Sequence, residues 1–384
     1  MKRIFSLILA SLLIASFLSA CTKYEDVKKI YLSQEKPGRT EEIMSEMSLS
    51  DKVYQMMFVT PEAITGVGTV IQAGEATKNA LAQYPVGGII YFSANLKDSV
   101  QTKEMIKNTQ SYSKIPLFIG VDEEGGIVSR LGSNSAMGVT HHPPMKEIGM
   151  SENPEKAYEV GRVLGEELSY LGFNVDFAPV ADILVNGENS VIGNRSFGTV
   201  PESVASMVSE AVKGMEEKGV SATLKHFPGH GSTYSDSHTG YAASSRTLTE
   251  LENNEFIPFA SGIEAGADFV MVAHITLVNA TEEKLPATLS KEVVDGMLKG
   301  KLGYKGIIIT DAMNMGAIVN DYTTEEATVK SILAGCDMVL MSKDLNRAHS
   351  AVMEAVASGE ITEERINESV KKIISLKLEK GMLK

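Results

Sequence analysis

Residues 306–310 read Gly-Ile-Ile-Ile-Thr, a continuous apolar run that ends directly before Asp311. A strand with one face in water alternates apolar and polar residues, whereas an unbroken run indicates a strand covered on both faces, as in a parallel sheet. The sequence contains seven further runs of this kind, at residues 55–59, 88–92, 117–121, 174–179, 221–226, 268–274 and 337–341. It therefore predicts eight buried parallel strands.

Amphipathic segments lie between these runs, and several of them end in glycine, as helices often do. The clearest are residues 153–171, 201–218, 290–302 and 323–333, and residues 360–384 predict a closing helix. Strands that alternate with helices through right-handed crossovers close into a (β/α)8 TIM-type barrel of the α/β class. The alternative is a doubly wound open sheet, which usually has fewer strands and a glycine-rich first turn that is absent here. We expect one barrel domain over residues 41–384.

The N-terminus has the pattern of an export signal. Met1-Lys2-Arg3 precedes an apolar stretch over residues 4–20, which is short for a membrane-spanning helix. The ending Leu18-Ser19-Ala20-Cys21 resembles the lipobox at which bacterial lipoproteins are cleaved and lipidated. We expect a signal peptide over residues 1–20, a lipid on Cys21, and a solvated tether to about residue 40. The protein would then be extracytoplasmic and anchored to the cell membrane; a plain signal peptide with an incidental cysteine is the alternative.

The charge balance argues against nucleic acid as a partner. The chain has 36 Lys and Arg against 49 Asp and Glu, a net charge of −13, and loss of Lys2 and Arg3 with the signal makes it −15. Such a surface repels phosphate backbones and anionic lipids.

The only other cysteine, Cys336, lies in an apolar run and is expected to be a buried, inert thiol. No Cys/His spacing suggests a metal site, and we expect neither a metal nor a cofactor.

Polar residues gather where the predicted strands end. The active sites of (β/α)8 barrels are built from the loops at the carboxyl ends of the strands, so these residues are candidates for a site. They are Asp122, Asp176, Asp182, Lys225, His226, His274 and Asp311.

One predicted strand end and its loop are especially rich in ionisable side chains. Residues 225–238 contain a lysine, three histidines and, two residues before His238, Asp236. A carboxylate beside an imidazole raises its basicity and fixes its tautomer. Taken alone, His230 is most simply a residue that shapes this loop, and His274 one that lines the barrel mouth.

This loop resembles the signature of glycoside hydrolase family 3, in the branch of β-N-acetylhexosaminidases whose acid/base is a histidine. The resemblance extends from about residue 42 to the C-terminus. Further matching segments are Gly120-Val121-Asp122-Glu123-Glu124-Gly125-Gly126 with Arg130 behind it, Gly193-Asn194-Arg195-Ser196-Phe197-Gly198, and residues 306–315. The chain departs from the family at Glu123, where glutamine is more common, and at Tyr234-Ser235. We expect the first departure to alter sugar contacts near Asp122 and the second to alter the mobility of the loop.

The resemblance implies a role for each matching residue. It makes Asp311 the nucleophile, His238 the general acid/base and Asp236 the partner of His238. It assigns the non-reducing sugar to Asp122, Arg130, Arg195, Lys225 and His226. Without it, Asp311 would be interpreted as a helix N-cap, Asp122 as a turn residue, the arginines as surface ion pairs and Lys225 as a buried ion-pair member.

The activity that the resemblance implies is that of a retaining exo-β-N-acetylglucosaminidase. It would release terminal β-linked N-acetylglucosamine from cell-wall fragments or chitooligosaccharides, without a cofactor. A phosphorylase is the alternative within this class, since an acid/base without negative charge tolerates an incoming phosphate. A β-glucosidase is less favoured, because those enzymes generally take a carboxylate acid from a further domain. An inactive sugar-binding lipoprotein is the alternative from another class. The sequence does not indicate the oligomeric state.

Overall fold

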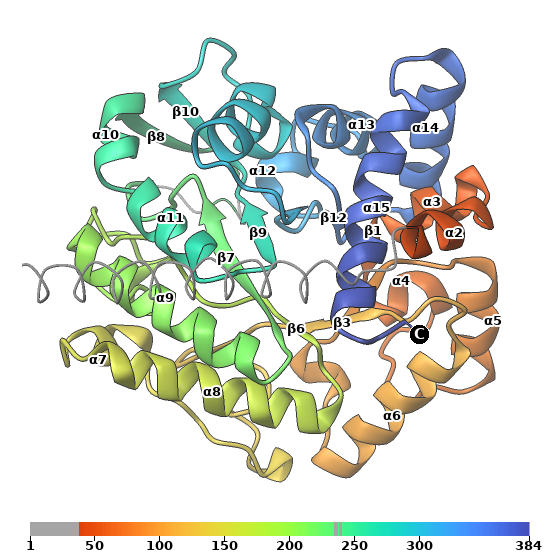
Figure 1. Cartoon of the computed structure of the whole chain (residues 1–384), viewed down its shortest axis with the longest axis horizontal. Helices are drawn as coiled ribbons and strands as arrows, with labels where there is room; N and C mark the ends of the chain where they lie inside the picture. The colour runs from red at the N-terminus through yellow and green to blue at the C-terminus, as the bar shows by residue number, and fades with distance from the viewer. Residues whose placement is uncertain (1–37, 234–236, 238–239, 384) are drawn as a thin grey trace, which may run out of the picture. The chain divides into compact units, whose positions relative to one another are not determined.

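The computed structural model describes residues 38–233, 237 and 240–383 (Figure 1). It divides into two units, Met1–Glu46 and Met47–Lys384. The described part of the first unit contains helix α2 (Arg39–Ser45). Within the described ranges, no helix combines the length and the apolar character needed to span a membrane. The expected signal peptide and Cys21 lie outside the described residues.

The second unit is built on eight parallel strands that neighbour one another in chain order. Strand β12 also pairs with β1, and β12 meets β11 through a bridge between Ile309 and Met338, with Thr310 N–H donating to the Met338 carbonyl at 3.1 Å. The strands are β1 (Met57–Val59), β2 (Gly88–Ile90), β3 (Phe118–Val121), β6 (Val175–Asp176), β7 (Ser221–Phe227), β9 (Phe269–Val272), β11 (Ile307–Thr310) and β12 (Val339–Leu340). All eight predicted strands and the barrel are confirmed, and the open-sheet alternative is wrong because the two edge strands meet.

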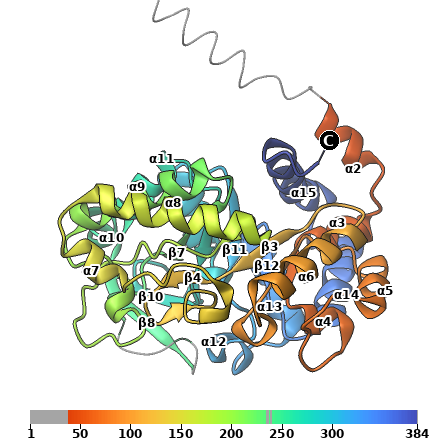
Figure 2. The ribbon, with the colours of Figure 1, turned by 90° about the horizontal axis from the view of Figure 1, so that it is seen from below.

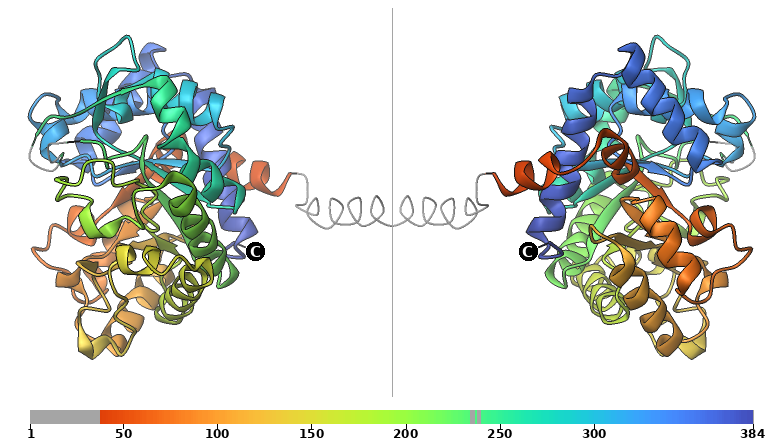
Figure 3. Two further views of the ribbon diagram at one scale, coloured as in Figure 1. Left: turned by 90° about the vertical axis from the view of Figure 1, so that its left-hand side faces the viewer. Right: turned by 90° about the vertical axis from the view of Figure 1, so that its right-hand side faces the viewer.

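Helices surround the outside of this sheet (Figure 3). Helices α8, α9 and α11 lie side by side along one flank (Figures 1 and 2). The helices are α3 (Leu49–Gln55), α4 (Pro61–Thr65), α5 (Glu75–Gln83), α6 (Ser99–Tyr112), α7 (Met145–Gly149), α8 (Pro154–Leu171), α9 (Pro201–Glu217), α10 (Leu248–Asn253), α11 (Phe256–Glu264), η5 (Glu292–Lys301), α12 (Gly316–Val319), α13 (Thr324–Ala334), α14 (Leu345–Ser358) and α15 (Glu363–Glu379). All five predicted helices are present, but η5 has the wider π-helical spacing.

Two small β structures were not predicted. Strands β4 (Glu123–Gly125) and β5 (Val128–Ser129) form an antiparallel hairpin directly after β3. Strands β8 (Ala242–Thr247) and β10 (Ile275–Asn279) form a parallel pair outside the barrel sheet. Each follows a barrel strand, so both add backbone at the end of the barrel where a site is expected.

Aromatic side chains fill the barrel interior. The rings of Phe58 and Phe177 meet edge to face with centroids 5.3 Å apart, and both side chains are fully buried. A Cβ atom on Gly88 or Gly120 would lie 2.6 or 2.8 Å from the Phe58 ring. The glycines on β2 and β3 therefore leave the space that the Phe58 ring occupies.

Candidate active site

A cavity of about 480 Å³ opens at the carboxyl ends of the barrel strands. Its lining includes every predicted nucleophile or sugar-binding residue, namely Asp122, Arg130, Arg195, Lys225, His226 and Asp311. Lys225 and His226 lie on β7, and the others come from the segments that follow β3, β5, β6 and β11. The predicted acid/base His238 and its partner Asp236 lie outside the described residues.

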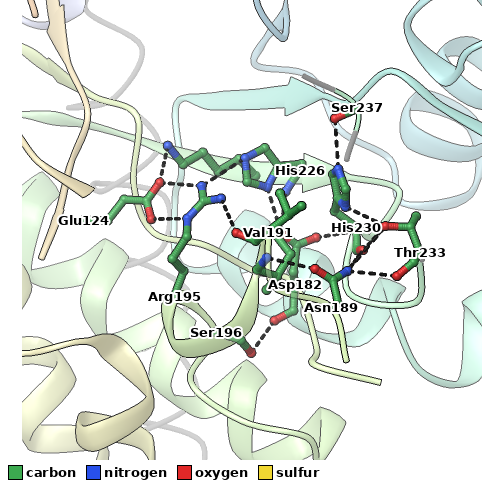
Figure 4. Close-up of polar contacts among 12 residues, drawn as sticks. Glu124, Asp182, Asn189, Val191, Arg195, Ser196, His226, His230, Thr233 and Ser237 are labelled. Atoms are coloured by element: carbon green, nitrogen blue, oxygen red, sulfur yellow. Dashed lines mark hydrogen bonds and ion pairs between the residues drawn. The ribbon is translucent and has the colours of Figure 1, made fainter. Parts of the chain in front are cut away.

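Glu124, for which the sequence indicated no role, lies at the centre of the charged network in this cavity (Figure 4). Its carboxylate accepts two hydrogen bonds from Arg195, both at 2.7 Å, and lies 2.7 Å from Lys225 Nζ. Burial would raise the pKa of Glu124, but the charges of Arg195 and Lys225 hold it well below its usual range. Glu124 is therefore ionised. Its spacing of two residues from Asp122 was the available signal, because alternate residues of an extended chain face the same side.

Asp122 lies between two cations. Lys225 Nζ donates to its Oδ1 at 2.9 Å, and Arg130 Nη2 is 3.5 Å from its Oδ2. Burial lowers the pKa of Lys225, but Asp122 and Glu124 more than offset this, and the net shift is upward. The ammonium group is therefore charged although its side chain is only 2% exposed. Arg130 Nε is buried without a hydrogen-bond partner in the described part of the chain.

Asp182 fixes the orientation of His226. Its carboxylate accepts from the His226 backbone N–H at 3.2 Å and from the His230 backbone N–H at 2.6 Å, and its Oδ2 lies 2.7 Å from His226 Nδ1. Arg195 Nη2 is 3.3 Å from His226 Nε2 (Figure 4). Since a guanidinium only donates, Nε2 accepts and the ring proton is on Nδ1. Asp182 was noted only for its position after a strand, and its role depends on this contact with the next strand.

Asp311 follows β11 directly. Its backbone N–H donates to the Val272 carbonyl at 2.9 Å, and its Oδ1 accepts from the Ala312 N–H at 2.7 Å. Helix α12 begins only at Gly316, with Met315 at its N-cap position, so Asp311 is not the cap of that helix. Buried His274 donates from Nε2 to the Ala312 carbonyl at 3.0 Å and holds the segment after Asp311; it is not among the residues that line the cavity.

His230 is held inside its own loop. Its Nδ1 lies 2.9 Å from Thr233 Oγ1, and its Nε2 lies 3.0 Å from Ser237 Oγ (Figure 4). Burial lowers the pKa of His230. The Ser237 carbonyl accepts from the Ala317 N–H at 3.1 Å, which ties this loop to α12. His230 does not line the cavity.

The side chain of Glu123 supports the hairpin and does not line the cavity. Its carboxylate accepts from the backbone N–H groups of Arg130 and Leu131, both at 2.7 Å, and from that of Gly132 at 3.1 Å. Our expectation that Glu123 alters sugar contacts finds no support in this placement, because the carboxylate is occupied by the loop that follows β5. Asp176 Oδ1 accepts from the Glu123 N–H at 2.9 Å, and burial raises the pKa of Asp176 well above its usual value.

Within the described residues, no group of three His, Cys, Asp or Glu side chains is arranged to hold a metal ion. Cys336 is fully buried, and burial raises the pKa of its thiol to about 12, as expected for an inert cysteine.

Comparison with known proteins gives consistent matches. The family model described as "Glycosyl hydrolase family 3 N terminal domain" matches residues 48–376. Beta-hexosaminidase A of Pseudoalteromonas piscicida is 33% identical over 322 residues, which cover 77% of this chain and 54% of that protein. Beta-hexosaminidase of Xylella fastidiosa (strain 9a5c) is 34% identical over 293 residues, covering 74% of this chain and 84% of that protein.

The structure is also similar to solved ones. A glycoside hydrolase family 3 beta-N-acetylglucosaminidase from Paenibacillus superposes with a TM-score of 0.82 at 38% identity, covering 87% of this chain and 63% of that one. The chain thus spans less than two thirds of this protein and of the Pseudoalteromonas relative, but most of the Xylella one.

Proposed function

The chain belongs to glycosyl hydrolase family 3, and from that premise we propose that it is a retaining β-N-acetylglucosaminidase that acts on the non-reducing end of an oligosaccharide. The curated relatives named above are called beta-hexosaminidases, and the solved relative is called a beta-N-acetylglucosaminidase.

The observation that carries this proposal is that the lining of the cavity combines a paired ionic network with apolar side chains. Its polar part includes Asp122, Arg130, Arg195, Lys225 and His226, which come from β7 and from the segments after β3, β5 and β6. Its apolar part includes Met271 of β9, Met315, Leu340 of β12 and Met341, together with Ile90 of β2 and Phe92. N-acetylglucosamine matches this mixed lining, because its ring hydroxyls need directional and charge-assisted hydrogen bonds while the methyl group of its acetamide needs apolar contact.

In the proposed reaction, an Asp311 carboxylate oxygen attacks the anomeric carbon while His238 donates its proton to the departing glycosidic oxygen. A covalent glycosyl-enzyme results. His238, now neutral, removes a proton from water, and the water oxygen displaces Asp311 from the sugar. Two inversions give net retention. The roles of His238 and Asp236 rest on the sequence resemblance alone.

Two variants test this assignment, each assayed on two substrates that differ in their leaving group. Asp311→Asn removes the nucleophile, so an aryl glycoside and a natural disaccharide should both lose activity by several orders of magnitude. His238→Ala should spare the first step for the aryl glycoside, which needs little protonation, and should slow hydrolysis of the intermediate. We therefore expect a burst of phenol, a larger loss on the disaccharide, and partial rescue of the aryl substrate by azide. Asp236→Asn should behave as a milder form of His238→Ala.

Equal losses on both substrates for His238→Ala, with neither burst nor azide rescue, would refute the acid/base assignment. The same assay in millimolar phosphate separates the phosphorylase alternative. Free N-acetylglucosamine as the main product is the expected result, and N-acetylglucosamine 1-phosphate as the main product would overturn hydrolysis.

We also propose that the enzyme works outside the cytoplasmic membrane on cell-wall fragments or chitooligosaccharides, anchored by a lipid on Cys21. The support is the sequence Leu18-Ser19-Ala20-Cys21. Cys21→Ala should abolish lipid labelling in the native host and release the protein from the membrane fraction. Unchanged labelling would contradict the anchor.

A further inference from the structure

The tip of the β4–β5 hairpin presents an apolar side chain at the catalytic cavity. Ile127 is 78% exposed, the highest value among the large hydrophobic residues that the structure describes, and it lines the cavity that contains Asp122 and Asp311. Single exposed hydrophobic residues are common and need no explanation by themselves. Its position at the cavity is what distinguishes Ile127 from similarly exposed residues such as Val100 and Met150.

The backbone holds this tip in place. Gly126 N–H donates to the His142 carbonyl at 2.9 Å, and a Cβ atom on Gly126 would lie 2.9 Å from Pro144 Cα. The residue has a φ of 57°, which favours glycine. At the far end of the hairpin, the Glu123 carboxylate binds the backbone N–H groups of Arg130 and Leu131. The position of Ile127 is therefore fixed by packing and hydrogen bonds on both sides.

A second apolar residue lines the same cavity from another segment. Val191 follows β6 in the chain, and its carbonyl accepts from Arg195 Nη1 at 3.0 Å. The guanidinium that binds Glu124 thus also fixes the backbone of Val191 (Figure 4).

The charges of the described cavity residues leave no cation for an anionic ligand. Three carboxylates, Asp122, Glu124 and Asp311, face three cations, Arg130, Arg195 and Lys225. Each cation lies within ion-pair distance of Asp122 or Glu124. A carboxylate on the ligand would have to compete with these pairs, whereas a neutral ligand would leave them intact.

We propose that Ile127, with Val191, forms an apolar contact for the leaving sugar and selects a neutral aglycone over one that carries a carboxylate. This inference rests on the proposed function. The proposed function assigns the transferred sugar to the buried charged residues of the cavity, so the exposed tip is left to contact the next unit. The C–H face of a neutral pyranose, such as the second unit of a β-linked N-acetylglucosamine oligomer, packs well on aliphatic side chains.

The experiment compares three substrates. The first is N-acetylglucosaminyl fluoride, whose leaving group is fluoride and not a sugar. The second is the β-1,4-linked dimer of N-acetylglucosamine. The third is N-acetylglucosamine β-linked to N-acetylmuramic acid, which carries a carboxylate. The wild type should prefer the neutral dimer to the acidic disaccharide in kcat/KM. Ile127→Ser should lower kcat/KM on the dimer roughly three- to tenfold, mainly through KM, because one aliphatic contact at an open rim is lost. It should change the rate on the fluoride less than about twofold.

Two further variants sharpen the comparison. Val100→Ser makes a similar change at a residue that is 74% exposed on α6, away from the cavity lining, and should leave all three rates unchanged. Ile127→Arg should raise the ratio of acidic to neutral disaccharide turnover, because it supplies an unpaired cation.

Each adverse result has its own meaning. Equal losses on the fluoride and the dimer would show that Ile127 supports the transferred sugar, and no loss on the dimer would show that it contacts neither; both overturn the inference. A wild-type preference for the acidic disaccharide would overturn the choice of aglycone. A wild type inactive on all three substrates would instead overturn the proposed function, and the inference with it.

Discussion

At the scale of single residues, Glu124 is a buried carboxylate that joins two cations of the cavity, although no role was predicted for it from the sequence. It neutralises Arg195 and Lys225, and Lys225 in turn holds Asp122. A buried carboxylate with two buried cations is costly to break, because removing one partner leaves charge without compensation.

We therefore predict that Glu124→Gln loses at least about 100-fold in kcat/KM and about 3 kcal/mol in the free energy of unfolding. Steady-state kinetics and urea unfolding measure the two losses. Glu123→Gln is the matched control, since it makes the same chemical change one residue earlier, where the carboxylate binds backbone N–H groups. It should reduce stability while retaining most of kcat/KM, and equal kinetic losses in both variants would contradict the special role of Glu124.

At the scale of elements, the segment after β7 packs closely against the segment after β6. A Cβ atom on Gly231 would lie 1.9 Å from the Ile183 carbonyl oxygen and 2.7 Å from its carbon. Backbone atoms cannot yield as a flexible side chain can, so these two segments fit together only with glycine at position 231.

We predict that Gly231→Ala lowers the free energy of unfolding by about 1–3 kcal/mol, as overpacking does. It should also reduce kcat, because Asp236 and His238 follow in the same segment. Gly187→Ala is the control, since no atom lies within 4 Å of its Cβ position, and it should be close to neutral. Thermal unfolding and assays of both variants check this, and wild-type kinetics for Gly231→Ala would show that the loop tolerates the displacement.

At the scale of the whole barrel unit, one ionic cluster joins three distant parts of the chain. Lys380, just after α15, contacts Glu216 of α9 and lies 2.7 Å from Asp268, which directly precedes β9. Burial and the neighbouring Asp268 raise the pKa of Glu216 to about 8. Burial is the larger cause and the negative charge of Asp268 adds to it, while the ammonium group of Lys380 opposes both.

This cluster should make stability fall as pH rises. The pKa of Glu216 is higher in the folded protein than its usual 4.5, so its contribution is fully present below about pH 4.5 and is lost as pH rises through 8. Glu216→Gln should reduce the loss of unfolding free energy between pH 5 and pH 8.5 by on the order of 1–3 kcal/mol. Urea unfolding at both pH values tests this, and an unchanged pH dependence would rule out Glu216 as its source.

The sequence by itself determined the eight strands, their order and the end of the barrel at which the site lies. This was possible because burial on both faces requires an unbroken apolar run, and because the residue after such a run lies at the carboxyl end of its strand. The predicted positions of Asp122, Lys225, His226 and Asp311 in one cavity followed from these local facts together with the family resemblance.

Only the tertiary structure decided which of these groups bind one another. Glu124 and Arg195 are 71 residues apart, and Asp182 and His226 are 44 apart, so no local pattern links them. The β4–β5 hairpin is short, β8 has no continuous apolar run, and β10 begins three residues after β9 ends, so none of them gave the signal that marked the barrel strands. Ion pairing and hydrogen bonding depend on distance in space and on burial, and the barrel sets both when it brings the strand ends together.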